Sequence, residues 1–177
     1  TSVSQRQRWD TIGALMRERR EQEDAKVLVV VSALSGMTNQ LQSAIEHADD
    51  AVFLAGLLQS IHTRHFEFAD VLGLHADKVL SERMLELQHL FADPRRLARG
   101  FDWQAEVLAQ GELLSSTLGV AYLKSQGLAV DWLDARDWLN ALRMPNQSAW
   151  AERLSVSCDY QGSADWQARF EANAPLL

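Results

Sequence analysis

The hydrophobic residues at 27–31 (VLVVV) follow one another without a polar interruption, and small and hydroxyl-bearing residues (SALSGMTN, 32–39) come directly after them. A strand without polar positions is typical of the centre of a parallel sheet, where both faces are covered. In open α/β sheets, ligands bind at the carboxyl ends of such strands. The pattern therefore predicts a buried strand at 27–31 and a ligand-binding loop at 32–39.

Most of the remaining chain places hydrophobic residues at intervals of three and four, which predicts amphipathic helices. A long helix is expected at 51–74, and a second at 76–91 that ends before Asp93-Pro94. Another helical pattern lies within 101–128 and ends at Gly127, a residue suited to the position after a helix. Shorter helices are expected after a capping box formed by Ser4 and Gln7, around 41–48, at 135–142 and at 164–172.

Two further segments have the composition or alternation of strands. Residues 128–133 predict a second strand, and residues 154–158 a third strand or an edge strand. Strands separated by long helices predict a mostly parallel sheet with helices on both faces, which is an α/β fold. Three strands are few for such a fold, so we expect further strands outside this chain. One domain is expected over residues 1–177, with a helical insert at about 51–92.

Charge and cysteine content narrow the functional classes. The net charge of −7 argues against non-specific binding of nucleic acids, which requires an excess of Lys and Arg. Cys158 is the only cysteine, so no intramolecular disulfide forms, and a reducing cytoplasm suits the chain. No hydrophobic run approaches the length that spans a bilayer, and the first residues do not resemble a signal peptide. We therefore expect a cytoplasmic protein with neither nucleic acid nor membrane as a partner.

Two places along the chain carry candidate binding chemistry. The loop 32–39 offers hydroxyls and backbone N–H groups at the start of a helix, which suit an anion or carboxylate. Simple capping of this helix by Ser35 or Thr38 explains the same residues equally well. Gly111 lies inside a helical pattern at a cost of roughly 1 kcal/mol relative to alanine. This glycine therefore indicates close approach of another backbone or of a ligand. Its neighbour Glu112 either faces a substrate ammonium or hydroxyl group, or is a solvated side chain.

Other candidates are weaker. His62 and His65 are three residues apart on a predicted helix, but no acidic or cysteine residue nearby completes a metal site, so a structural role is favoured and no metal is predicted. Asp134 and Arg136 follow the second predicted strand. They lie where a ligand would bind, and a local pair within a turn explains them equally well.

The two motifs together resemble a known family. VVVSALSGMTN is similar to the signature of aspartate kinases, and QGELLSSTLGVAYLKSQGLAVDWLDAR resembles the second conserved segment of that family, in the same order. The opening Thr1-Ser2-Val3 is similar to the end of the family's K-F-G-G-T-S-V motif. QRQRWDTIG and LDARDWL look closest to the kinase portion of bacterial bifunctional aspartate kinase/diaminopimelate decarboxylase chains. The sequence is thus identified as the N-terminal, aspartate-binding part of an aspartate kinase catalytic domain.

This resemblance implies a fold and a reaction. The family has the amino-acid-kinase fold, a three-layer α/β/α sandwich with a mostly parallel sheet, which would be incomplete in this chain. The reaction transfers the γ-phosphoryl group of ATP to the β-carboxylate of L-aspartate, with Mg as the metal, in the first step towards lysine, threonine and methionine. Enzymes of this family are commonly dimers, so a homodimer is expected.

Site residues follow from the resemblance by position. Thr38 resembles a residue that contacts aspartate through its hydroxyl, and Glu112 resembles the acceptor for the substrate's amino group. Ser32 resembles a catalytic residue close to the transferred phosphoryl group. Ser35 and Gly36 resemble residues that shape the aspartate-binding loop. Thr1 and Ser2 resemble residues on the ATP-binding side.

The sequence departs from the family pattern at both ends. The lysine and two glycines that precede the Thr-Ser-Val motif are not in this sequence, nor is the later Gly-Arg-Gly-Gly-Ser-Asp segment. We therefore expect no appreciable kinase activity from this chain alone. Two alternatives remain open: another enzyme of the same fold, such as a glutamate kinase, and a non-catalytic helical interaction module.

Overall fold

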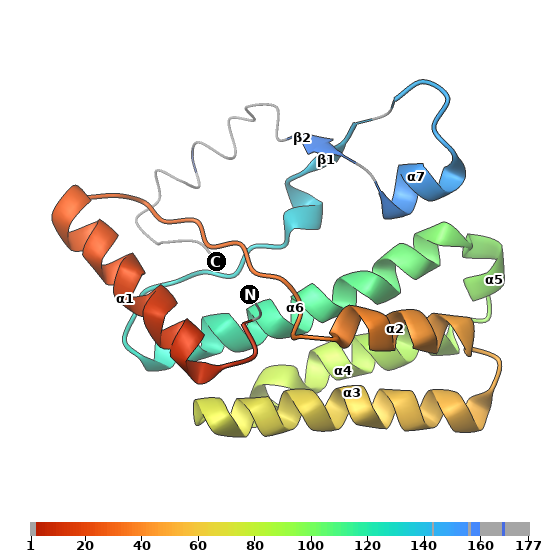
Figure 1. Ribbon diagram of the computed structural model, residues 1–177, viewed down its shortest axis with the longest axis horizontal. Helices are drawn as coiled ribbons and strands as arrows, with labels where there is room; N and C mark the ends of the chain where they lie inside the picture. Colours follow the sequence, from red (N-terminus) through yellow and green to blue (C-terminus); the bar gives the residue numbers. More distant parts are fainter. Residues whose placement is uncertain (1–2, 143, 156, 160–167, 169–177) are drawn as a thin grey trace.

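The computed structural model describes residues 3–142, 144–155, 157–159 and 168. Its centre is helix α6 (Phe101–Ser125), which is hydrophobic on nearly all sides and contributes twelve buried residues. Around it pack α1 (Arg6–Glu23), α2 (Met37–Glu46), α3 (Ala51–Leu72), α4 (Ala76–Ala92) and the short helices α5 (Arg96–Arg99) and α7 (Ala149–Leu154). Figure 1 shows α2, α3 and α4 running roughly along α6, with the extended segments on the opposite side of it.

The pair α3 and α4 confirms the helices expected at 51–74 and 76–91. Asp50 caps α3, because its side chain accepts hydrogen bonds from the N–H groups of Val52 and Phe53. Gly73 ends the helix in the left-handed region, with a φ of 73°. Helix α4 ends at Ala92, directly before Asp93-Pro94, as predicted.

The end of α6 also agrees with the sequence analysis. Gly127 has a φ of 79°, and the N–H of Leu128 donates to the carbonyl of Leu123 at 3.1 Å. This bond from the second residue beyond the helix is typical of a Schellman ending, which requires a residue in the left-handed region. The assignment of Gly127 as the residue after the helix is therefore confirmed.

The predicted capping box at the start of α1 is wrong. Gln5 occupies the N-cap position without a side-chain bond to the helix. The Ser4 hydroxyl instead accepts a hydrogen bond from the N–H of Ser35 at 2.8 Å. A contact with a distant loop has thus replaced the local cap.

Helix α1 is held against α6 by the indole of Trp9, which is fully buried. The ring lies over Gly119 so closely that a Cβ atom at this glycine would be 2.0 Å from it. The indole N–H donates to the carbonyl of Val3 at 2.9 Å, and the Tyr122 hydroxyl of α6 donates to the carboxylate of Asp10. Gly119 is therefore required by packing.

The strand predicted at 27–31 is extended but does not form a regular ladder. Leu28 takes part in an isolated β-bridge, and so does Asp131 of the segment predicted as the second strand. Val27, Val29 and Val31 are partly buried against the hydrophobic core, whereas Leu28 is 41% and Val30 87% exposed. The prediction that both faces are covered is therefore wrong for the described residues, because no second layer packs on the outward face of this segment.

The only sheet of the described residues is a two-stranded antiparallel pair. Strands β1 (Asn140–Ala141) and β2 (Cys158–Asp159) pair in the register Asn140 to Asp159 and Ala141 to Cys158. The expected mostly parallel sheet is therefore not observed in the described part of the chain. A central parallel strand needs neighbours along both edges, and the described segments do not supply them.

Near the C-terminal end, the structure differs from the predicted secondary structure in two places. The helix expected at 135–142 is wrong: a single 3-10 turn, η1 (Ala135–Asp137), is followed by β1, and the N–H of Leu142 bonds across to Ser157. Leu154, expected in a strand, ends α7, so pairing starts only at Cys158. The helix expected at 164–172 lies outside the described residues apart from Ala168, which is helical.

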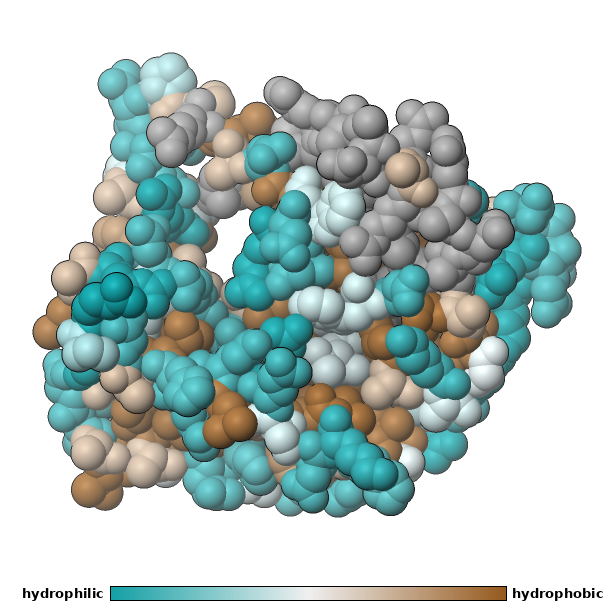
Figure 2. Space-filling model, turned by 180° about the vertical axis from the view of Figure 1, so that it is seen from behind, coloured by the Kyte–Doolittle hydropathy of each residue, from teal (hydrophilic) through white to brown (hydrophobic). Residues whose placement is uncertain are grey.

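The described surface carries both hydrophobic and hydrophilic residues. Figure 2 shows hydrophobic residues at the surface of the face seen from behind, interspersed with hydrophilic ones. Among the described residues, no helix is long and hydrophobic enough to cross a membrane.

The contact between Trp9 and Gly119 gives a test of packing. We predict that Gly119→Ala lowers the free energy of unfolding by about 2 kcal/mol or more, towards the upper end of typical overpacking costs, because the new methyl group must displace the indole. Gly56 in α3 is the matched control, since nothing lies within 4 Å of an added Cβ there. Gly56→Ala should stabilise the protein by roughly 0.5–1 kcal/mol. Equal effects of the two changes in urea unfolding would contradict the packing.

The buried His65 gives a test of pH dependence. Its Nδ1 lies 2.8 Å from the carbonyl of Ile61 and its Nε2 has no partner among the described residues. Burial lowers the pKa of His65 from 6.5 to about 4. The unfolded chain therefore binds this proton at a higher pH than the folded chain, so stability is lost as the pH falls from 6.5 towards 4.

The complete loss in the free energy of unfolding is roughly 3 kcal/mol, since each pKa unit corresponds to about 1.4 kcal/mol. Urea unfolding at pH 7 and pH 4.5 measures it. His65→Phe should remove most of the difference between the two pH values, whereas the same change at the exposed His89 should leave it in place. An unchanged pH dependence in His65→Phe would show that another group is responsible.

Candidate functional site

The loop after the extended segment is pressed against α6 at Gly111. Ala33 is 8% exposed, and a Cβ atom at Gly111 would lie 2.9 Å from the Cβ of Ala33 and 3.3 Å from the side chain of Leu41. Real Cβ atoms essentially never approach a heavy atom closer than 3.0 Å. The glycine therefore allows α6 to approach the loop, as the sequence analysis proposed for this position.

Hydrogen bonds on both sides of Gly111 hold the loop in place. The Glu112 carboxylate accepts from the N–H of Ala33 at 3.4 Å, a long bond, and the two residues are 79 positions apart in sequence. The fully buried Ser115 hydroxyl lies 2.9 Å from the carbonyl of Ser32, to which it donates. The two motif segments of the sequence thus meet directly.

The start of α2 completes the loop. Gly36 is the N-cap residue with a φ of 76°, and α2 has no side-chain cap. The alternative that Ser35 or Thr38 simply caps this helix is therefore wrong. The N–H of Met37 donates to the carbonyl of Leu34 at 2.9 Å, and the exposed Thr38 side chain makes no hydrogen bond within the described part of the chain. Thr38 is thus accessible to a ligand.

A cation lies beside this loop that sequence reasoning did not identify. The Nη1 atom of Arg64, from α3, is 3.7 Å from the place where a Cβ of Gly36 would be. Arg64 forms no ion pair with the described residues. Its sequence neighbourhood gives no signal of this position, because the contact arises from the packing of α3 on α2.

Glu112 also lines a hollow of about 450 Å³ between residues 28–31, α6 and residues 132–139. Most of its lining is hydrophobic. Its polar side chains include Ser116, which accepts from the indole N–H of Trp132 at 2.9 Å. Neither Ser32, Ser35, Gly36 nor Thr38 lines this hollow. The structure therefore links Glu112 to the loop through Ala33, while Thr38 lies outside this hollow.

Asp134 and Arg136 at the edge of this hollow are paired with each other. The guanidinium donates to both carboxylate oxygens, and the N–H of Arg136 also donates to Asp134 at 3.0 Å. The guanidinium lowers the pKa of Asp134, and the carboxylate raises the pKa of Arg136. This geometry supports the interpretation as a local pair within a turn.

The remaining candidate residues are two histidines of α3 and the first two residues of the chain. His62 stacks on Phe66 with ring centroids 3.8 Å apart, and His65 is buried. Within residues 3–142, 144–155, 157–159 and 168, no three His, Cys, Asp or Glu side chains are grouped so as to hold a metal ion. Thr1 and Ser2 lie outside the described residues.

Comparison with known proteins connects this chain to a family. No family model matches the chain. Over 138 residues the chain is 32% identical to the bifunctional aspartokinase/homoserine dehydrogenase 2 of Escherichia coli K12; the match takes in 75% of this chain and 16% of that protein. The chain therefore spans about a sixth of the length of this relative.

Solved structures show the same fold. E. coli aspartokinase III in complex with aspartate and ADP (R-state) matches 98% of this chain with a TM-score of 0.73, at 18% identity and over 37% of its own length. The same enzyme in complex with lysine and aspartate (T-state) matches 92% with a TM-score of 0.63, at 20% identity and over 36% of its length. This likeness supports an α/β fold class for the chain although its described part is mostly helical. Together with the sequence match it shows that the chain is homologous to part of the aspartate kinases, as its two motifs indicated.

Proposed function

We propose that this chain is the N-terminal, aspartate-binding part of an aspartate kinase. The observation that carries the proposal is the direct contact between the two motif segments, in which Glu112 and Ser115 of α6 bond to the backbone of Ala33 and Ser32. A substrate loop needs a fixed backbone so that its donors keep their positions. The hydrogen bonds and the contact at Gly111 provide this fixation.

The proposed roles follow from what each side chain offers. The Glu112 carboxylate is a charged acceptor beside the loop and would accept N–H bonds from the ammonium group of L-aspartate. The Thr38 hydroxyl would donate to a substrate carboxylate at the start of α2, where the helix dipole favours negative charge. Ser32 would lie close to the transferred phosphoryl group. Because Thr38 lies outside the hollow that Glu112 lines, the proposal requires L-aspartate to bridge the loop between them.

ATP and Mg belong to the proposal only at the level of a whole enzyme, where they would supply the phosphoryl group and neutralise its charge. The described residues do not fit them: they contain no grouping suited to a metal ion, and the arginine of the Glu112 hollow is already paired with Asp134. We therefore derive no step through either group from this chain. A diaminopimelate decarboxylase partner and a dimer stay predictions.

Binding of L-aspartate tests the proposal. Titration calorimetry with the 177-residue chain should show binding of L-aspartate and no binding of L-glutamate at the same concentrations. Glu112→Gln should weaken binding about tenfold, since a hydrogen bond to a charged group is worth roughly 1.5–3 kcal/mol. Glu82→Gln, at an exposed position of α4, is the matched control and should bind like the unmodified chain.

The outcome decides among the alternatives. Thr38→Val should weaken aspartate binding by a similar factor, whereas Thr63→Val on the exposed side of α3 should not. Preference for L-glutamate would favour another enzyme of the same fold. No response to either amino acid, together with a melting temperature unaffected by both Thr38→Val and Glu112→Gln, would favour a helical interaction module.

Activity gives a second test. With Mg-ATP and L-aspartate, the chain alone should release no ADP above the level without aspartate, because Arg136 of the Glu112 hollow is paired with Asp134 and the described residues group no metal ligands. A coupled assay for ADP measures this, with hydroxylamine trapping of an acyl phosphate as confirmation. Aspartate-dependent ADP release would show that this chain carries a complete catalytic site.

A further inference from the structure

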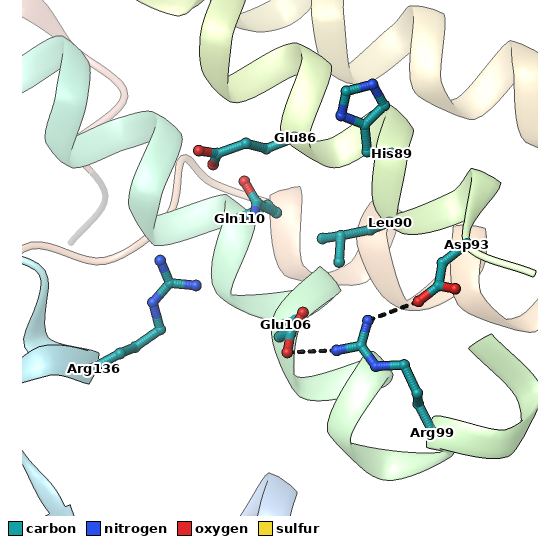
Figure 3. Close-up of a pocket in the computed structure, with 8 residues that line it drawn as sticks. All are labelled: Glu86, His89, Leu90, Asp93, Arg99, Glu106, Gln110 and Arg136. Atoms are coloured by element: carbon teal, nitrogen blue, oxygen red, sulfur yellow. Dashed lines mark hydrogen bonds and ion pairs between the residues drawn. The ribbon is translucent and has the colours of Figure 1, made fainter. Parts of the chain in front are cut away.

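A second hollow, of about 420 Å³, lies between α4, the chain after α4, and α6. Figure 3 shows charged and polar side chains reaching into it from both helices, with Arg136 approaching from η1. The hydrophobic hollow beside Glu112 shares only Arg136 with it. It therefore forms a separate feature of the molecule.

Gln110 of α6 lines this hollow and is 3% exposed. Its Oε1 atom is buried and has no hydrogen-bond donor among the described residues. A buried carbonyl oxygen without a donor costs roughly 1–3 kcal/mol. Figure 3 shows the Gln110 amide among the polar side chains that line the hollow.

The cations around the hollow are already paired. Arg99 donates to Asp93 at 3.0 Å and to Glu106 at 2.5 Å, as Figure 3 shows. Each of these bonds occupies one oxygen of its carboxylate. Glu86 accepts a hydrogen bond from Arg83 of α4 through one oxygen, Oε2. The guanidinium of Arg136 is occupied by Asp134.

Several hydrogen-bond acceptors of the hollow remain uncommitted. The second carboxylate oxygens of Glu86 and Glu106 join Oε1 of Gln110 in this set. The lining residues carry three carboxylates and two guanidinium groups, and Arg83 pairs with Glu86 beside them. An anion is disfavoured, because carboxylate and amide oxygens would face it.

We propose that this hollow binds the ammonium group of a small primary amine. A primary ammonium group has three N–H donors, no acceptor and a single positive charge, which suit uncommitted carboxylate and amide oxygens. One donor satisfies the buried Oε1 of Gln110, and the others reach the carboxylates of Glu86 and Glu106. The rest of a small amine fits within about 420 Å³.

The test uses propylammonium chloride as the probe and the side-chain amide of Gln110 as the reporter, in proton–nitrogen correlation spectra at pH 7. The Gln110 amide signals should shift and saturate with propylammonium, and potassium chloride at the same concentrations should produce no saturating shift. A shift that does not saturate, or an equal one with potassium chloride, would overturn the proposal. So would an unmoved Gln110 signal, which would mean that water alone satisfies this oxygen.

A variant pair sharpens the test. Gln110→Met keeps the size of the side chain and removes the acceptor, so propylammonium should bind about tenfold more weakly, followed through the backbone signals of α4 and α6. Gln88→Met, at an exposed position of α4, should bind like the unmodified chain. Unchanged affinity in a folded Gln110→Met protein would contradict the proposal. The titration of the unmodified chain decides the matter even where this variant fails to fold.

Discussion

The close contact between Gly111 and Ala33 is the constraint on which the candidate site depends. Any side chain at Gly111 would push a Cβ into that of Ala33, at 2.9 Å, and move α6 away from the loop. The two hydrogen bonds from α6 to the loop lie one residue and four residues further along the helix, at Glu112 and Ser115. They form only because the helix and the loop are this close. A glycine that is unfavourable for an isolated helix therefore fixes the backbone of the predicted substrate loop.

A second glycine of α6 also allows a close contact, which serves the packing of the helices and not the candidate site. Gly119 lies two turns further along and receives the indole of Trp9, which brings α1 onto the helix. The two contacts, with the Ser4 to Ser35 bond, place the start of the chain and the predicted substrate loop on one central helix. The helical part of the molecule is thus a support, and the extended segment 27–31 rests on it with Val30 facing outward.

Helices were predictable from sequence and strands were not, for a physical reason. The helices at 51–72 and 76–92 satisfy their own backbone groups, so local periodicity and signals such as Asp50 and Gly73 determine them. A strand at 27–31 needs partners on both edges, and the hydrophobic pattern alone does not supply them. The predicted helix at 135–142 failed because a pairing with Ser157 and Cys158, remote in sequence, takes precedence over local preference.

The site was partly predictable as well. Gly111 broke the helical pattern without a local reason, and this signalled the close approach that the structure shows. The position of Glu112 beside the loop follows from that contact, and Arg64 and Gln110 gave no signal because their surroundings come from helix packing. The Ser4 hydroxyl was misassigned, because a capping motif does not reveal competition from a distant N–H group.

Amide hydrogen exchange of the loop 32–39, followed by NMR with and without L-aspartate, tests the central claim most directly. The account predicts that the Ala33 and Ser35 amides, both hydrogen-bonded, are protected, and that L-aspartate increases their protection. In Gly111→Ala the same amides should lose protection while those in the middle of α4 keep theirs. Protection that is unaffected by both the substitution and the ligand would contradict the claim that α6 holds this loop in place to bind aspartate.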